Sequence, residues 1–217
     1  AAWGKLFGQW RVGAAVLLWD IRGKPDLDRM LRIIGEQGVT GFCAPPTLYR
    51  GFVQLDLGVY DWSSLRHCTS AGEPLNPEVI RRFRSEMKLA IGDGYGQTET
   101  GPVAGMRPDE DDPERDGSMG RPLPGIEVRV NKGQLEVRPG TVPTFFSHYL
   151  GEEPFHGEWW PTGDHVREDE DGYLWFEGRT DDVIISAGYR IGPFEVESAL
   201  LSHPGVAEAA AVAAPDE

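Results

Sequence analysis

Residues 92–101, with the sequence GDGYGQTETG, combine side chains that suit phosphate and metal chemistry. Glycines let a ligand approach the backbone amides, and threonine hydroxyls can donate hydrogen bonds to phosphate oxygens. The Glu99 carboxylate can hold a divalent cation. The apolar residues 89–91 predict the end of a strand, and ligands of α/β sheets bind at the carboxyl ends of strands. A glycine-rich turn with a capping glutamate explains the same residues without any ligand.

Three further segments place polar residues at predicted loops. Residues 70–75 (SAGEPL) join a predicted strand to a predicted helix, and their glycine and rigid proline could form the wall of a flat pocket. Residues 160–164 (WPTGD) end on Asp164, a carboxylate that can accept hydrogen bonds from a ribose diol. Residues 178–184 (GRTDDVI) place Arg179 at a junction between regions. Taken singly, a strand-to-helix turn and a surface ion pair explain the first and the last segment.

Helix and strand signals alternate up to about residue 105, and these elements must position the loops. Asp26 is a predicted N-cap of a helix with apolar residues at helical spacing, which Gly38 closes. Asn76 is the predicted N-cap of a second helix, with Pro77 at its first position. The predicted strands are residues 39–44, 67–70 and 89–91. Repeated strand-helix-strand units predict a parallel or mixed sheet with packed helices.

Beyond Gly117 the pattern changes to β structure. Residues 126–130 and 134–138 alternate apolar and polar side chains on either side of residues 131–133 (NKG), which predicts an antiparallel hairpin. Residues 173–177 predict another strand.

From Gly178 a third region is predicted. It comprises a strand at residues 183–186, a turn at Gly188, a helix opened by Pro193 and a strand at residues 206–213. The predicted fold class is therefore α/β. A mixed sheet with packed helices occupies residues 1–116, a small β subdomain residues 117–177, and the start of a small α+β C-terminal domain residues 178–217.

Composition limits the classes of function. The 217 residues, 40% of them hydrophobic, can bury a core, and the net charge of −14 disfavours nucleic acid or an anionic membrane as a partner. The longest uncharged apolar run, residues 12–19, is too short to span a bilayer. Cys43 and Cys68 predict buried, reduced thiols in a cytoplasmic protein, and the histidines form no metal-ligand pattern. The oligomeric state stays open, homo-oligomers included.

Five motifs in this order resemble the adenylate-forming superfamily of acyl-CoA synthetases, firefly-type luciferases and peptide-synthetase adenylation domains. They are GEP (72–74), YGQTE (95–99), GSMGRPLPG (117–125), TGD (162–164) and GRTDDVIISAGYRIGPFEVE (178–197). The motifs span nearly the whole chain. Within the superfamily, GEPLNPEV and YGQTETG are most similar to acetyl-CoA and medium-chain acyl-CoA synthetases.

The resemblance implies an ATP site. Gly72, Glu73 and Pro74 would line one face of the adenine, Tyr95 would stack on the other face, and Asp93 would lie near the amino group.

Phosphate, metal and ribose contacts follow from the same resemblance. Thr98 would donate to the α-phosphate and Glu99 would bind Mg²⁺. Asp164 would accept from the ribose hydroxyls, assisted by Arg179.

The last motif implies a moving C-terminal domain. Asp181 matches the hinge, Arg190 would approach phosphate in one domain orientation, and Gly188 would lie in the turn brought to the site for thioester formation with coenzyme A. Acetyl-specific relatives carry a tryptophan where this chain has Gly96, which implies space for a medium-chain or aromatic acid. Relief of backbone strain explains Gly96 equally well.

The implied function is that of an acid-CoA ligase: ATP activates a carboxylic acid as an acyl-adenylate, and coenzyme A then displaces AMP. Two parts of the superfamily pattern are missing, the upstream Ser/Thr/Gly-rich phosphate loop and the C-terminal catalytic lysine, since the last lysine is Lys132. The chain alone is therefore expected to be inactive. A noncatalytic nucleotide-binding domain and an adenylation domain that loads a carrier protein are the alternatives.

Overall fold

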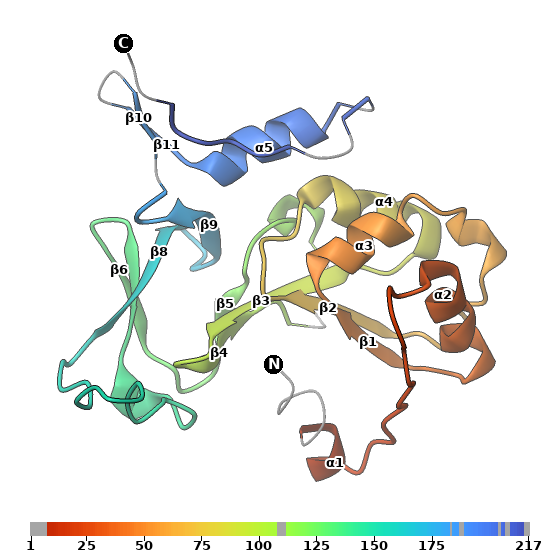
Figure 1. The fold of residues 1–217 in the computed structure, drawn as a ribbon, viewed down its shortest axis with the longest axis horizontal. Helices are drawn as coiled ribbons and strands as arrows, with labels where there is room; N and C mark the ends of the chain where they lie inside the picture. Colours follow the sequence, from red (N-terminus) through yellow and green to blue (C-terminus); the bar gives the residue numbers. More distant parts are fainter. Residues whose placement is uncertain are drawn as a thin grey trace.

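The computed structural model describes residues 8–107, 112–182, 184–186, 189–203, 205–206 and 209–214. Three sheets follow one another along this part of the chain, of five, four and two strands. In Figure 1 the five-stranded sheet carries helices α3 and α4 along one side, and helix α5 lies above strand β9 of the second sheet. This arrangement confirms the predicted fold class, a mixed sheet with packed helices followed by a small β unit.

The first sheet has the order β1-β2-β3-β4-β5. Its strands are β1 (Gly41–Ala44), β2 (His67–Ala71), β3 (Ile91–Gln97), β4 (Gly101–Gly105) and β5 (Arg121–Pro122). The first three strands are parallel, whereas β4 is antiparallel to both of its neighbours. Strand β3 therefore lies in the interior of the sheet, and its carboxyl end turns directly into β4.

Three helices cover one face of this sheet. They are α2 (Leu27–Glu36), α3 (Pro46–Phe52) and α4 (Pro77–Met87). The predicted caps are confirmed, because the Asp26 side chain accepts from the backbone N–H of Arg29 and the Asn76 side chain accepts from that of Glu78. The core beneath these helices contains Leu31, Ile34, Tyr49, Phe52, Val79, Ile80, Phe83 and Met87.

Helix α3 was not among the predicted elements. Pro45 and Pro46 directly follow the predicted strand at residues 39–44, and Pro46 occupies the first turn of α3. A proline is accepted there because its missing N–H would have no partner within the helix in any case. Short helical turns complete this half: α1 (Gln9–Arg11), η2 (Leu57–Val59) and η3 (Pro113–Arg115).

The other face of the sheet is not covered by these helices. Alternate residues of β2 are buried and exposed, and in β1 Ala44 is buried whereas Cys43 is exposed. The prediction that both cysteines are buried is therefore wrong for Cys43, which lies on the uncovered face because neighbouring strand residues point to opposite faces. Cys68 is buried, and both thiols are free.

The second sheet is antiparallel, in the order β6-β7-β8-β9. Its strands are β6 (Val128–Asn131), β7 (Gln134–Val137), β8 (Trp160–Glu168) and β9 (Leu174–Arg179), with η4 (Pro139–Thr141) after β7. The predicted hairpin is confirmed, and both residues of its turn, Lys132 and Gly133, have positive φ angles of 52° and 86°. Such a two-residue turn matches the twist of the strands it joins.

Two segments predicted as loops are strands. The strand predicted at residues 89–91 instead begins at Ile91 and continues through the glycine-rich stretch to Gln97, and residues 160–164 form the first half of β8. Glycine and polar residues lower β propensity, but pairing with a neighbour on both sides outweighs that preference. The candidate residues Asp93, Tyr95 and Asp164 therefore lie in strands of the sheets and not in loops.

The last part of the chain forms the hairpin β10 (Ile184–Ser186) and β11 (Tyr189–Ile191), followed by α5 (Pro193–Leu201). The strand predicted at 206–213 is wrong for the described residues of that range, which have no regular structure and pair with no strand there. Strand β5 continues the first sheet beyond residue 116, and β9 continues the second beyond residue 177. No helix within the described ranges is long and apolar enough to cross a membrane.

Candidate functional site

A buried carboxylate lies at the centre of the candidate site. Asp164, in β8, is 5% exposed and faces Arg179 of β9 across the antiparallel pair. The Arg179 Nη1 atom donates to Asp164 Oδ1 at 3.1 Å and to the carbonyl oxygen of Thr162 at 3.3 Å. Burial tends to lower the pKa of Arg179, but Asp164, Asp181 and Tyr95 together outweigh this effect and raise that pKa. The guanidinium therefore stays charged beside Asp164.

Strand β3 brings two more donors to the same carboxylate. Tyr95 and Gln97 are two residues apart and so point to the same face of the strand. The Tyr95 hydroxyl donates to Asp164 Oδ2, and Gln97 Nε2 donates to the same oxygen at 2.9 Å. Burial and the nearby carboxylate raise the pKa of Tyr95 far above its usual value, so its hydroxyl remains a donor. Two motifs distant in sequence, YGQTE and TGD, are therefore joined by hydrogen bonds.

The turn after β3 carries the candidate phosphate and metal ligands. Residues 98–100 connect β3 to β4, with Thr98 exposed and Glu99 partly exposed. The backbone N–H of Gln97 donates to Thr100 Oγ1 at 3.1 Å, which fixes the turn. The Tyr149 hydroxyl donates to Glu99 Oε1 at 2.7 Å, from a side chain that is 43% exposed.

A metal at this turn would have to be shared with a ligand. No group of three or more His, Cys, Asp or Glu side chains that could hold a metal ion occurs within the described ranges. Glu99 is a single carboxylate, and Mg²⁺ is commonly bound by one or two carboxylates together with substrate phosphates and water. The Glu99 turn fits that mode of binding.

The GEP loop forms one wall of a cavity of about 490 Å³. Gly72 has a φ of +108°, a conformation that favours glycine. The Thr47 hydroxyl donates to both Glu73 carboxylate oxygens at 3.2 Å, which ties the loop to α3. Pro74 and Arg179 line the cavity together with residues of β9 and α5, among them Phe176 and Phe194. The GEP loop and the arginine that holds Asp164 thus face one space.

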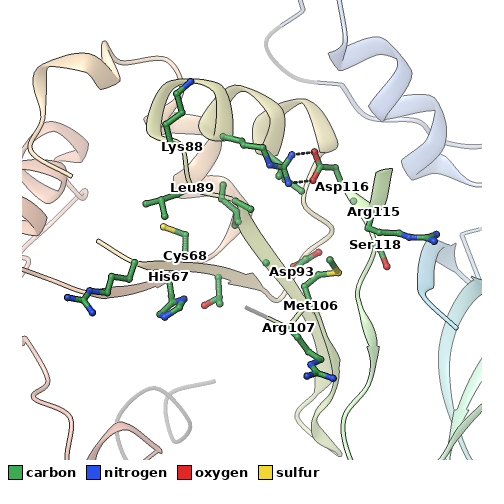
Figure 2. A pocket seen from close by; sticks show the side chains of 18 residues that line it. His67, Cys68, Lys88, Leu89, Asp93, Met106, Arg107, Arg115, Asp116 and Ser118 are labelled. Atoms are coloured by element: carbon green, nitrogen blue, oxygen red, sulfur yellow. Dashed lines mark hydrogen bonds and ion pairs between the residues drawn. The ribbon is translucent and has the colours of Figure 1, made fainter. Parts of the chain in front are cut away.

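Asp93 lies on a different cavity. It lines a space of about 150 Å³. His67, Cys68, Met106 and Arg107 line the same space (Figure 2). Asp93 is 5% exposed, and burial raises its pKa to about 7, against hydrogen bonds from the backbone N–H groups of Gly94 and Leu75. The Leu75 bond connects it to the residue after Pro74, although the described structure does not place Asp93 in the cavity of the GEP loop.

Gly96 has a close backbone neighbour. A Cβ atom on Gly96 would lie 2.1 Å from the carbonyl oxygen of Gly101, at the point where the pairing of β3 with β4 shifts register. This contact alone requires a glycine. Substrate size is therefore not needed to explain Gly96, and a Gly96→Trp change would disturb the hairpin as well as any acyl pocket.

The candidate residues of the last motif are only partly described. Asp181 is exposed in the turn after β9, and its Oδ1 atom lies 3.5 Å from Arg179 Nε. Arg190 lies in β11, paired with Ile185, and its side chain lies outside the described structure. Gly188 lies outside the described residues.

Sequence reasoning missed three contributors to the site. Gln97 binds Asp164, Thr162 supplies a carbonyl oxygen to both Gln97 and Arg179, and Tyr149 binds Glu99. The period of two along a strand could have paired Gln97 with Tyr95, had β3 been assigned. Tyr149 gave no such signal, because the contact spans 50 residues of chain.

Comparison with known proteins gives consistent matches. The model of the family described as AMP-binding enzyme matches residues 1–152. The mouse (Mus musculus) protein "Acyl-coenzyme A synthetase ACSM3, mitochondrial" is 41% identical over 238 residues, covering 100% of this chain and 40% of the relative. "4-hydroxybutyrate--CoA ligase 1" of Metallosphaera sedula is 44% identical over 232 residues, covering 99% of this chain and 41% of the relative. The chain thus spans about two fifths of these relatives' length.

Among solved structures, the anthranilate CoA ligase AuaEII in complex with anthranoyl-AMP is similar with a TM-score of 0.86 and 33% identity. The match covers 97% of this chain and 43% of that one. The similarity therefore extends over the sheets and the hairpin that hold the candidate residues.

Proposed function

Because the chain belongs to the AMP-binding enzyme family, we propose that it forms part of an ATP-dependent acid-CoA ligase. In the first step a carboxylate attacks the α-phosphate of ATP, which gives an acyl-adenylate and pyrophosphate. In the second step the thiol of coenzyme A attacks the acyl carbon, which gives a thioester and AMP. The relatives named above are synthetases or ligases that form CoA thioesters.

The convergence of three motifs on Asp164 carries this proposal. Tyr95 and Gln97 come from YGQTE, Asp164 from TGD, and Arg179 from the start of the last motif, yet all four share hydrogen bonds. Asp164 Oδ2 accepts two of these bonds and Oδ1 only one. A carboxylate oxygen can accept two, so Oδ1 keeps capacity for a ribose hydroxyl.

The turn beside this carboxylate supplies the phosphate contacts. Thr98 directly follows Gln97, and its exposed hydroxyl donates to an α-phosphate oxygen as charge develops there. Glu99 would hold Mg²⁺, and the bound ion would neutralise phosphate charge. The turn follows β3, whose Tyr95 and Gln97 side chains bind Asp164. The hairpin that carries the phosphate contacts therefore also holds the carboxylate that would bind the ribose.

The adenine lies against the GEP loop in this proposal. Glu73 and Pro74 line the cavity that Arg179 also lines. In this proposal Gly72 lies beside them against the same face of the adenine, and Tyr95 stacks on the other face. Asp93, which lines the other cavity, supports the wall through the N–H of Leu75.

The C-terminal hairpin and helix serve the second step. Asp181 acts as the hinge, Arg190 meets phosphate in one orientation of the domain, and Gly188 meets the pantetheine of coenzyme A in the other. These roles follow from the positions of the residues within the last motif.

A medium-chain or aromatic acid is the proposed substrate class. The name of the mouse relative, an acyl-coenzyme A synthetase, and the anthranilate ligase similarity support it. The cytoplasm is the proposed location, supported by two free thiols.

Acid-dependent exchange of radiolabelled pyrophosphate into ATP tests the first step, measured on the full-length protein across acids of two to ten carbons and benzoic acids. Exchange with at least one acid, and a CoA thioester on adding coenzyme A, is the expected result. Exchange without thioester, but with loading of a carrier protein's thiol, would instead assign the protein to carrier-protein loading. ATP binding by calorimetry without any exchange would identify a noncatalytic nucleotide-binding domain.

A further inference from the structure

Gln97 uses both N–H groups of its side-chain amide between the two sheets. Its Nε2 atom donates to the Thr162 carbonyl oxygen at 2.8 Å and to Asp164 Oδ2 at 2.9 Å. Gln97 ends β3 of the first sheet, whereas both acceptors lie in β8 of the second. One side chain therefore ties the strand that leads to the Thr98 turn to the strand that carries Asp164.

The surroundings of Gln97 hold this bridge in one arrangement. Thr100 fixes the Gln97 backbone, and the Thr162 hydroxyl donates to the Leu135 carbonyl oxygen at 2.8 Å. The backbone N–H of Asp164 donates in turn to Thr162 Oγ1 at 3.2 Å. Both ends of the bridge are thus anchored, so the amide sets the orientation of the Asp164 carboxylate.

We infer that Gln97 is a positioning residue that orients Asp164 so that Oδ1 faces the ribose of the bound nucleotide. This inference rests on the proposed function. By occupying Oδ2 together with Tyr95, Gln97 leaves Oδ1 as the oxygen with remaining capacity. A primary amide of this length suits the position, because it presents two donors on one nitrogen without adding a charge. Leucine offers no donor, and glutamate would set two carboxylates against each other.

The same geometry couples ribose recognition to phosphate positioning. Gln97 and Thr98 are neighbours in the chain, so the residue that holds Asp164 is followed directly by the turn that carries the candidate phosphate ligand.

The experiment compares ATP with 2′-deoxy-ATP and 3′-deoxy-ATP in pyrophosphate exchange by full-length wild type, Gln97→Leu and Gln97→Glu. Gln97→Leu is expected to lower kcat/KM for ATP about ten- to a hundredfold, the equivalent of one hydrogen bond to a charged group. The loss is expected to be much smaller with whichever deoxynucleotide lacks the hydroxyl that Asp164 accepts. Gln54→Leu, the same change at an exposed position, is the matched control and should leave the exchange rates with all three nucleotides unchanged.

The pH profile gives a second readout. In Gln97→Glu two carboxyls would share one site, which raises the pKa of the pair, so activity with ATP is expected to recover as the pH falls from 8 towards 6. Equal fold losses for ATP and both deoxynucleotides, with no recovery at low pH, would overturn the positioning role. A wild-type protein without any exchange would instead overturn the proposed function itself.

Discussion

Two carboxylates of the candidate site, Asp164 and Glu99, have the same chemistry and opposite surroundings. Asp164 is buried in a strand and accepts from Tyr95, Gln97 and Arg179, whereas Glu99 sits on a turn and accepts from one exposed tyrosine. Three protein side chains thus donate hydrogen bonds to the Asp164 carboxylate, and one donates to the Glu99 carboxylate. Glu99 therefore keeps more lone pairs that a ligand could use. A preformed carboxylate suits a ribose, whose hydroxyls are neutral, and an open one suits a hydrated cation.

Asp164→Ala is expected to destabilise the fold. It removes an acceptor that three donors share, although Gln97 and Arg179 keep the Thr162 carbonyl oxygen. Because the Arg179 side chain is 46% exposed, water screens part of the lost interaction, and we expect a loss of about 1–3 kcal/mol of unfolding free energy. Urea denaturation of the full-length protein measures this loss. Asp28→Ala is a matched control, because Asp28 also accepts from an arginine and a tyrosine, Arg32 and Tyr60, but its side chain is 49% exposed. Equal losses for both variants would show that burial does not distinguish the two sites.

Asp93→Asn tests how the partners of a buried carboxylate affect its pKa. Asp93 is as buried as Asp164 but accepts hydrogen bonds from backbone N–H groups rather than from a cation. Its pKa of about 7 lies above the value of an unfolded chain, so the folded state binds more protons between pH 4 and 7. Wild-type stability is therefore expected to fall as the pH rises through this range, by on the order of 4 kcal/mol for three pKa units. Asp93→Asn should lack this dependence. Denaturation at pH 4.5, 6 and 8 measures it, and parallel pH profiles would contradict the prediction.

Glu99→Ala is expected to change activity and leave the fold intact. Loss of the metal ligand should lower magnesium-dependent adenylate formation about a hundredfold or more, the effect of removing one group that stabilises developing charge. The unfolding free energy should change by less than about 1 kcal/mol, since within the described ranges the Glu99 side chain is hydrogen-bonded only to Tyr149, an exposed tyrosine. Pyrophosphate exchange and denaturation are measured on the same preparation, with Glu152→Ala as an exposed control. A normal rate of pyrophosphate exchange in Glu99→Ala would show that Glu99 is not the magnesium ligand.

Capping and turn chemistry predicted much of the fold. Asp26 and Asn76 cap the helices assigned to them, and Lys132-Gly133 forms the expected hairpin turn, because these signals act between near neighbours. The prediction failed where distant strands decide the local structure. The glycine-rich stretch of β3 becomes a strand only because β2 and β4 pair with it.

The candidate site shows the same division between local and distant signals. The order of the motifs and their residue types predicted Tyr95, Asp164 and Arg179 through a family resemblance. The structure brings these three side chains together. The Gln97 bridge depends on how two sheets meet, and residue types alone carry no information on that geometry.

Tyr149→Phe is expected to have the smallest effect, and it tests whether Glu99 is as open as the comparison requires. The Tyr149 hydroxyl holds Glu99 Oε1 at 2.7 Å, and the ring packs against Phe146, with ring centres 4.8 Å apart. Phenylalanine keeps the ring contact and removes only the hydroxyl. A hydrogen bond of this kind contributes about 1 kcal/mol, so the Mg²⁺ concentration for half-maximal exchange should rise about fivefold as Glu99 loses its fixed orientation.

Tyr60→Phe is the control for this change, because it removes another tyrosine hydroxyl that donates to a carboxylate, that of Asp28. It should leave the Mg²⁺ dependence unchanged. A fall in the half-maximal Mg²⁺ concentration of Tyr149→Phe would have the opposite meaning, since Tyr149 would then compete with the cation for Oε1. In that case Tyr149 would occupy a lone pair of Glu99 that the cation needs. Asp164 and Glu99 would then differ only in how many of their lone pairs the protein occupies.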